Sequence, residues 1–292
     1  MMKVLITGSN GQLGLCLQDR AMKFGFEVIA VDAGTLDITD KDQVDAFVAQ
    51  VSPIAIINAA AYTAVDKAEV DFDLAHKVNA LGPQYLADAA KQCGIPLLHV
   101  STDYVFDGQS CEAYRPSDTP NPSGVYGKTK LEGEQLVLQT HAQSIVVRTA
   151  WVFSEYGNNF VKTMLRLAGE RDDLGVIADQ YGCPTYAGDL ANALFQLLTK
   201  IIETNEWSGF GVYHFCGDEA TSWHGFTRTI LDFAKQKELI RYLPQLNAIR
   251  TEDYPLPAPR PTYSVMDCSS LESLVEINRD WKASLQYVLS KL

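Results

Sequence analysis

Short apolar runs alternate with amphipathic stretches through the first half of the chain. The apolar runs at residues 3–7, 27–32, 54–57, 97–101 and 144–148 predict buried strands. Between them, apolar residues recur at helical spacing. This predicts helices from Leu13 to Phe24 and over residues 40–51, 72–92 and 126–140, with Asp40 as an N-cap. Strands that alternate with helices in this way predict an α/β fold with a parallel, doubly wound sheet.

The second half of the chain loses this regular alternation. Helices are predicted over residues 158–168, 190–203 and 222–235, and strands over residues 174–177 and 212–215. A proline-rich stretch follows at residues 254–261. Because proline donates no backbone hydrogen bond and stiffens a loop, this stretch fits either a pocket wall or a solvent-exposed linker.

A glycine-rich turn follows the first predicted strand. Residues 8–14, Gly-Ser-Asn-Gly-Gln-Leu-Gly, lie between that strand and a helix. Glycines there permit a tight turn and close approach of a pyrophosphate, and the helix N-terminus offers N–H groups to phosphates. Asp32 closes the next strand, where a carboxylate can accept hydrogen bonds from adenosine ribose hydroxyls. An ordinary turn and a surface aspartate are the alternatives, but the order of these elements favours dinucleotide binding.

Residues 126–130, Tyr-Gly-Lys-Thr-Lys, repeat the catalytic pair of a reductase. On a helix, Tyr126 and Lys130 lie on one face with about 5–6 Å between their Cβ atoms. At that range a lysine cation is expected to lower the tyrosine pKa from about 10 towards neutrality. Such a phenol can give a proton to a carbonyl oxygen. Without context, a half-buried aromatic and a solvated lysine are the more common explanation of this spacing.

Bulk composition fits a cytoplasmic globular protein. The 292 residues carry a net charge of −12, so neither nucleic acid nor an anionic membrane is expected as a partner. No run approaches about 18 apolar residues, and the N-terminus lacks the profile of a signal peptide. The six cysteines contain no C-x-x-C pair, and the five histidines show no ligand spacing. We therefore expect reduced thiols and no metal site, with Cys183 and His99 in packing roles.

Several longer motifs together resemble one family. They are residues 58–69 (Asn-Ala-Ala-Ala-Tyr-Thr-Ala-Val-Asp-Lys-Ala-Glu), 101–106 (Ser-Thr-Asp-Tyr-Val-Phe), 125–130, 148–152 (Arg-Thr-Ala-Trp-Val), 157–160 (Gly-Asn-Asn-Phe), 179–185 (Asp-Gln-Tyr-Gly-Cys-Pro-Thr) and 260–261 (Arg-Pro). With the glycine turn, they resemble the dTDP-4-dehydrorhamnose reductase family of the extended short-chain dehydrogenase/reductase superfamily. The resemblance implies a Rossmann domain over residues 1–150, with a returning segment near 187–218, and a smaller substrate-binding domain over 151–292.

The resemblance also implies a role for each matching residue. Thr102, Tyr126 and Lys130 would be catalytic, with Thr102 on the substrate carbonyl, Tyr126 as proton donor and Lys130 on the nicotinamide ribose. NADH or NADPH would be held by Gly8, Asn10, Gly11, Gln12, Leu13, Gly14, Asp32, Asp37, Ile38, Ala59, Ala60, Ala61, Thr63, Tyr126 and Lys130. A nucleotide sugar would meet Val65, Thr102, Asp103, Tyr126, Trp151, Asn159, Gln180 and Arg260. The implied reaction is reduction of the C4 ketone of dTDP-4-dehydro-L-rhamnose.

Two other functions compete with this one. Nucleotide-sugar dehydratases resemble the chain at residues 101–103 but follow the aspartate with a glutamate base, where this chain has Tyr104. Epimerases retain NAD tightly through their cycle. From another class, the regulatory subunit of methionine adenosyltransferase resembles the same family without being a catalyst.

A monomer and a homodimer are both consistent with the sequence. Some members use a glutamate in a magnesium-linked dimer contact. The corresponding position, two residues after Gly14, is Cys16 in this chain, and a thiol is a poor ligand for magnesium.

Overall fold

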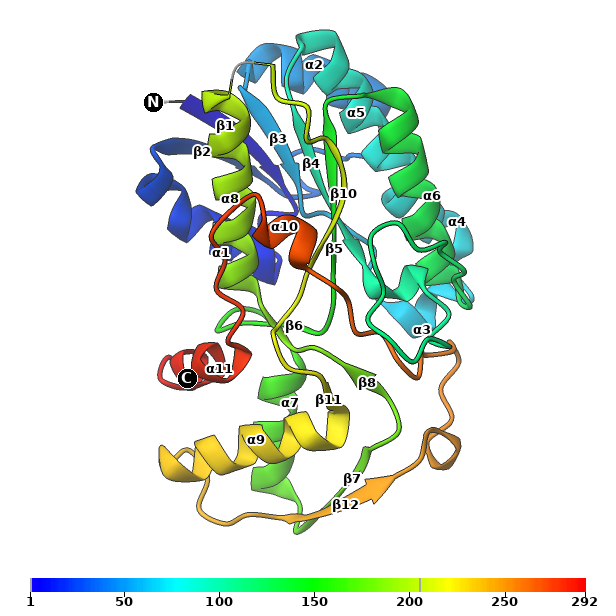
Figure 1. The fold of residues 1–292 in the computed structure, drawn as a ribbon, viewed down its shortest axis with the longest axis vertical. Helices are drawn as coiled ribbons and strands as arrows, with labels where there is room; N and C mark the ends of the chain where they lie inside the picture. The colour runs from blue at the N-terminus through cyan, green and yellow to red at the C-terminus, as the bar shows by residue number, and fades with distance from the viewer. Residues whose placement is uncertain (1, 205) are drawn as a thin grey trace.

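Six parallel strands form the central sheet of the computed structural model, which describes residues 2–204 and 206–292 (Figure 1). In spatial order they are β10 (Gly211–Phe215), β5 (Ser144–Thr149), β4 (Leu97–Thr102), β3 (Ala55–Asn58), β1 (Met2–Thr7) and β2 (Phe26–Val31). Chain order reverses between β1 and β3, whose ends are paired as Thr7 with Asn58. Ligands of open parallel sheets bind beyond the carboxyl ends of the strands at such a reversal.

Helices cover both faces of the sheet, so the predicted doubly wound architecture is confirmed (Figure 1). Alternate strand residues supply the two cores, because successive side chains of a strand point to opposite faces. Ile6 packs with Leu17 of α1 (Gln12–Ala21) and Leu194 of α8 (Ala187–Glu203). Leu5 packs on the other face, in the core shared by α2 (Lys41–Val51), α5 (Gly82–Cys93) and α6 (Val125–Thr140). Asp40 caps α2 as predicted, accepting from the Gln43 N–H.

The single helix predicted over residues 72–92 is three consecutive stretches. Between α4 (Phe72–His76) and α5, residues Lys77–Leu81 form a π-helical segment. Asn79 lies in it, and its side chain accepts from the Tyr62 N–H at 2.8 Å and donates to the Tyr62 carbonyl at 3.1 Å. These bonds hold the loop that follows β3, so the irregular turn positions one wall of the cleft described below.

We call the central sheet with its helices the first layer. The second half of the chain adds a smaller second layer, whose core contains Phe153, Phe226 and Trp281. Its longer elements are α7 (Phe160–Glu170), β7 (Asp173–Ile177), α9 (Trp223–Gln236), β12 (Gln245–Ile249) and α11 (Trp281–Leu289). The short strands are β6 (Val152–Phe153), β8 (Tyr181–Gly182), β9 (Thr185–Tyr186) and β11 (Thr221–Ser222). Sequence patterning predicted α7, β7, α8, β10 and α9. It missed β12, α11, the short strands, α3 (Val65–Ala68), α10 (Ser269–Glu272) and the 3₁₀ turns Asp103–Val105 and Thr251–Asp253. The helix predicted from Leu13 to Phe24 ends as a 3₁₀ turn, Met22–Phe24.

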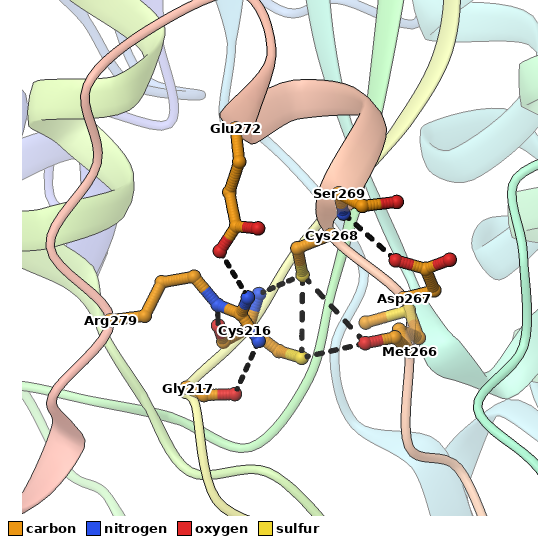
Figure 2. A network of polar contacts seen from close by, with 8 residues as sticks. All are labelled: Cys216, Gly217, Met266, Asp267, Cys268, Ser269, Glu272 and Arg279. Carbon is orange, nitrogen blue, oxygen red and sulfur yellow. Dashed lines mark hydrogen bonds and ion pairs between the residues drawn. The ribbon is translucent and has the colours of Figure 1, made fainter.

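Thiols and one arginine tie the C-terminal segment to the end of β10 (Figure 2). The Cys216 Sγ lies 3.7 Å from the Cys268 Sγ, and the Cys216 N–H donates to the Cys268 sulfur at 3.3 Å. Arg279 donates to the carbonyls of Cys216 and Gly217 at 2.8 and 3.2 Å. Cys183, assigned to packing, shares the buried apolar cluster of Cys216 and Cys268. These contacts close the sheet edge with the last part of the chain.

Native thiol titration should distinguish two classes of cysteine. Cys93 and Cys111 are exposed, whereas Cys16, Cys183, Cys216 and Cys268 are buried free thiols. Burial raises the pKa of Cys16 to about 12, and the thiolate is the reactive form. An aromatic disulfide reagent at pH 8 should therefore react rapidly with Cys93 and Cys111 alone, and with all six thiols in denaturant. Rapid reaction in the Cys93→Ser, Cys111→Ser double variant would contradict this packing.

Candidate active site

A cleft of about 610 Å³ lies at the carboxyl ends of the strands, where the strand order reverses. Its walls include the ends of β1, β4 and β5 and the loops after β2 and β3. Every residue assigned to the cofactor from the sequence lines this cleft except Gly14. Sequence reasoning assigned no role to the other lining residues, which are Thr7, Ala33, Leu36, Thr39, Val78, Val100, Ser101, Thr149, Val152, Gly157, Asn158 and Leu190. Ser101, Thr149, Val152, Gly157 and Asn158 belong to the motifs at residues 101–106, 148–152 and 157–160, which were the available signal.

Backbone packing explains the glycines of the first turn. Gly8 has φ +69°, and a Cβ there would lie 2.6 Å from the Ala60 nitrogen. A Cβ on Gly14 would lie 2.2 Å from the Gly8 carbonyl oxygen, so Gly14 supports the turn from beneath although it does not line the cleft. Side chains are thus absent where the turn meets α1. This leaves the free N–H groups of the helix open to a phosphate, so the residues present fit a dinucleotide.

Asp32 belongs to the wall of the same cleft. Its carboxylate accepts from the Asn10 amide at 2.6 Å and from the Thr35 N–H and hydroxyl, both at 3.1 Å. The Thr35 hydroxyl in particular lowers the pKa of Asp32. The side chain is therefore charged at neutral pH, and it links the glycine turn to the loop after β2.

The end of β4 and the start of α6 bring the three expected catalytic residues together. Thr102 ends β4, and its hydroxyl lies near enough to Tyr126 to oppose the rise in the pKa of that phenol that burial causes. Gly127 permits this approach, because a Cβ there would lie only 2.1 Å from the Tyr104 carbonyl oxygen. Lys130, one turn further along α6, lines the cleft and is 1% exposed.

The expected effect of Lys130 on Tyr126 is absent from this structure. The Lys130 Nζ donates to the Val100 carbonyl at 2.7 Å. Burial raises the pKa of Tyr126 to about 12, with Asp103 adding to the rise, and burial lowers the pKa of Lys130 to about 8. The prediction that Lys130 brings the tyrosine pKa towards neutrality was therefore wrong. Desolvation outweighs the attraction that the spacing suggested.

Residues assigned to the substrate fall into two groups. Asp103 is buried beside Tyr126 and accepts from the Thr102 hydroxyl at 3.1 Å, and burial raises its pKa to about 6. Val65 begins α3, and its neighbour Asp66 holds Arg260 through two hydrogen bonds of 2.8 Å. Tyr104 lies near both Tyr126 and Arg260. Its ring meets that of Tyr126 edge-on at 5.5 Å. Burial raises the pKa of the Tyr104 hydroxyl, and the nearby charge of Arg260 opposes this rise.

Trp151, Asn159 and Gln180 have structural partners in the second layer. Trp151 has φ +49° and stacks on Trp223 at 3.5 Å. Asn159 caps α7 and donates to the Gln12 side chain at 3.0 Å, which joins this layer to the glycine turn. Gln180 is buried and donates to the Thr251 hydroxyl at 3.0 Å. Their assignment to the substrate stays a prediction.

Two acidic residues that the sequence reasoning did not single out support the site from α3. Asp66 accepts from the Ala258 N–H at 3.1 Å as well as from Arg260, so it holds the proline-rich stretch against the first layer. Glu69 accepts from the Val125 N–H at 2.8 Å, at the first turn of α6 and one residue before Tyr126. Both lie in the motif at residues 58–69, which was the available signal. Among residues 2–204 and 206–292, no cluster of His, Cys, Asp or Glu could hold a metal ion, and no helix is long and apolar enough to span a membrane.

The fold and the cleft define a Rossmann protein with a threonine, tyrosine and lysine site, of the extended short-chain dehydrogenase/reductase type. A family model described as the RmlD substrate binding domain matches residues 2–292. A dTDP-4-dehydrorhamnose reductase of Aggregatibacter actinomycetemcomitans is 48% identical, with 99% of this chain and 98% of that one covered. The chain belongs to the dTDP-4-dehydrorhamnose reductase family, which confirms the resemblance seen in its motifs.

Solved structures agree with this assignment. The dTDP-4-dehydrorhamnose reductase of Clostridium acetobutylicum matches with a TM-score of 0.91 and 40% identity over 99% of both chains. That of Bacillus anthracis, in complex with NADP, matches with a TM-score of 0.90 and 37% identity over the whole of both chains. A UDP-glucose 4-epimerase of Thermus thermophilus, 20% identical with a TM-score of 0.80 over 99% of this chain and 98% of that one, shares the fold.

Glu69 should influence both stability and turnover through α6. Glu69→Ala removes the acceptor for the Val125 N–H and an anion from the helix N-terminus, which should cost about 1 kcal/mol of unfolding free energy. Turnover should fall because Tyr126 is the next residue, whereas Glu69→Gln should retain most activity. Urea unfolding and steady-state kinetics measure both effects, with Lys128→Ala on the exposed side of α6 as the control. Equal stability and turnover in Glu69→Ala and wild type would refute this support role.

Proposed function

We propose that this protein reduces the C4 ketone of dTDP-4-dehydro-L-rhamnose to dTDP-L-rhamnose with NADH or NADPH, in dTDP-rhamnose biosynthesis. The observation that carries the proposal is the arrangement of Thr102, Tyr126 and Lys130 beside the cleft that fits a dinucleotide. Membership of the family and the reductases of A. actinomycetemcomitans and C. acetobutylicum support the same reaction.

The protonation of Tyr126 suits reduction. Bound nicotinamide would supply the hydride, and the protein must then supply a proton to the same carbonyl. Because the pKa of Tyr126 is about 12, its phenol is protonated at neutral pH, which is the form a general acid needs. Thr102 would hydrogen-bond the same oxygen as negative charge develops. Lys130 would hold the nicotinamide ribose.

Substrate binding would use the residues that flank this centre. Arg260 offers a planar guanidinium suited to the diphosphate, and Asp66 orients it through two hydrogen bonds. We propose that residues 1–150 with 187–218 form the cofactor domain and that 151–292 otherwise form the substrate domain. We also propose a cytoplasmic enzyme that is a monomer or a homodimer. Tyr104 occupies the place of a dehydratase base, so elimination is not favoured.

Replacement of the proton donor tests the catalytic assignment. Tyr126→Phe should lower kcat by roughly 10²–10⁴, the usual contribution of general acid catalysis. NADH affinity, measured by quenching of protein fluorescence, should change little because the cleft keeps its shape. Tyr156→Phe, at a tyrosine bonded to Asp19 outside the cleft, is the matched control. Wild-type turnover in Tyr126→Phe would overturn the assignment.

The reaction itself can be tested with a coupled assay. dTDP-4-dehydro-6-deoxyglucose and a 3,5-epimerase would generate the substrate, and both NADH oxidation and dTDP-L-rhamnose would be followed. Consumption of NADH with formation of that product is expected. If neither occurs, the proposed reaction is wrong and the non-catalytic subunit becomes the leading alternative.

Coenzyme preference should depend on Asp32. Its charge in the cleft wall repels a 2′-phosphate, and no arginine follows it in the loop at residues 33–40. NADH should therefore be used at least as well as NADPH, with a small margin because solvent and salt screen an exposed charge. Asp32→Asn, which keeps the shape and removes the charge, should shift kcat/KM towards NADPH. A wild-type preference for NADPH above about tenfold, or 1.4 kcal/mol, would contradict this prediction.

A further inference from the structure

A chain of buried polar side chains runs beneath the cleft from β1 to α6. The Thr7 hydroxyl donates to the Asn58 Oδ1 at 2.7 Å, and the Asn58 Nδ2 lies 3.0 Å from the His99 Nδ1. The His99 Nε2 in turn lies 3.5 Å from the Lys130 Nζ. All four residues are at most 1% exposed, and the roles assigned so far use only Lys130.

Hydrogen bonding fixes the tautomer of His99. The backbone N–H of Ala60 donates to the Asn58 Oδ1 at 3.1 Å, which identifies that atom as the oxygen. The other terminal atom of Asn58 is therefore an NH₂ group, which can only donate. Its partner, the His99 Nδ1, must accept and so carries no proton. A neutral imidazole then bears its proton on Nε2, the nitrogen that faces Lys130.

This tautomer places two donors against each other. An ammonium group donates in every direction and accepts in none, so the protonated Lys130 gains nothing from the Nε2–H. The Lys130 ammonium instead donates to the Val100 carbonyl, at 2.7 Å. Lys130 also lines the cleft, where its remaining N–H groups can meet a ligand. A neutral amine, in contrast, could accept from the Nε2–H.

We propose that His99 is a positioning residue for Lys130. By presenting an N–H instead of a lone pair, it denies the ammonium a second acceptor inside the protein and directs the free N–H groups into the cleft. The same contact also stabilises the neutral amine of Lys130, because that amine can accept a hydrogen bond from the His99 Nε2–H. Thr7 and Asn58 maintain the effect by holding the imidazole in one tautomer.

The groups around Lys130 are consistent with this role. On α6, Glu134 raises the pKa of Lys130, but its carboxylate is held by Arg148 of β5 at 2.7–3.1 Å. Tyr126 on α6 stays neutral at physiological pH. On β4, burial lowers the pKa of His99 far below its ordinary range, and the positive charge of Lys130 lowers it further, so the ring stays neutral. Lys130, with a pKa of about 8, therefore changes charge near that pH while His99 and Tyr126 stay neutral.

Nitrogen NMR of histidine-labelled protein tests the tautomer directly and needs no substrate. His99 should show a protonated Nε2 and an unprotonated Nδ1 at every pH from 6 to 9, with the resonances assigned by their loss in His99→Gln. A protonated Nδ1, or a titration within this range, would overturn the proposal. This result is independent of turnover, so it stands apart from the reaction proposed above.

Paired variants test the effect on Lys130. In His99→Gln the carboxamide N–H can replace the Nε2–H, whereas His99→Phe presents no donor. Lysine ¹³Cε titrations should give a Lys130 pKa near 8 in wild type and in His99→Gln, and a higher one in His99→Phe. Because the charged form is lost as pH rises through that value, the alkaline limb of kcat should move upward in His99→Phe alone. If the Lys130 pKa rises by one unit, the fraction of the maximal rate that is reached at pH 9 should increase about fivefold.

His141→Gln is the control, since His141 is buried at the far end of α6 and bonds the Ile95 carbonyl. Identical Lys130 titrations in wild type and His99→Phe would refute the proposal, as would a shift in His141→Gln. If His99→Phe fails to fold, the tautomer measurement on the wild type still decides. The expected tautomer and Lys130 shift together with no turnover on the nucleotide sugar would leave the positioning role intact and overturn the reaction.

Discussion

The site depends on the close contact of α6 with two stretches of backbone, the turn after β4 and the π-helical segment Lys77–Leu81. A Cβ added at Gly127 would lie 2.1 Å from the Tyr104 carbonyl oxygen, and one added at Gly133 would lie 2.0 Å from that of Asn79. The helix therefore rests directly on the main chain, with no side chain between. A larger residue at either glycine would move α6 outward. The close contact therefore brings Tyr126 near Thr102, and it lets Lys130 reach the Val100 carbonyl.

The same contact helps to bury three ionisable groups to which we assign catalytic or substrate-binding roles. Burial raises the pKa of Tyr126 and Asp103 and lowers that of Lys130, so all three shifts favour the uncharged form. An argument from spacing alone predicted the opposite direction for Tyr126. It counted the attraction between neighbouring charges, but it had no access to the depth at which α6 lies.

Local signals predicted much of the first layer. The alternation of strands and helices, the glycine turn and the Tyr126–Lys130 pair each occupy a few consecutive residues, and their lining of one cleft followed from the parallel sheet. What the sequence could not reveal depends on distant partners. Arg260 and Asp66 are 194 positions apart, and the role of His99 depends on Asn58, 41 positions away. β12, Gln-Leu-Asn-Ala-Ile, is short and contains no buried residue, and it becomes a strand by pairing with β7, which lies far earlier in the chain.

The path of the C-terminal segment has a consequence for synthesis of the chain on the ribosome. From β12 the chain passes α3, where Arg260 meets Asp66, and then reaches α10 beside β10 (Figure 1). On the way, this segment forms two isolated β-bridges, one between Tyr263 and Tyr181 and one between Met266 and Tyr114. The sheet from β1 to β5 can form while later residues are still being translated. The side of the cleft that we propose for the substrate must wait for this C-terminal segment, so a nascent chain would form its dinucleotide site before the proposed substrate site.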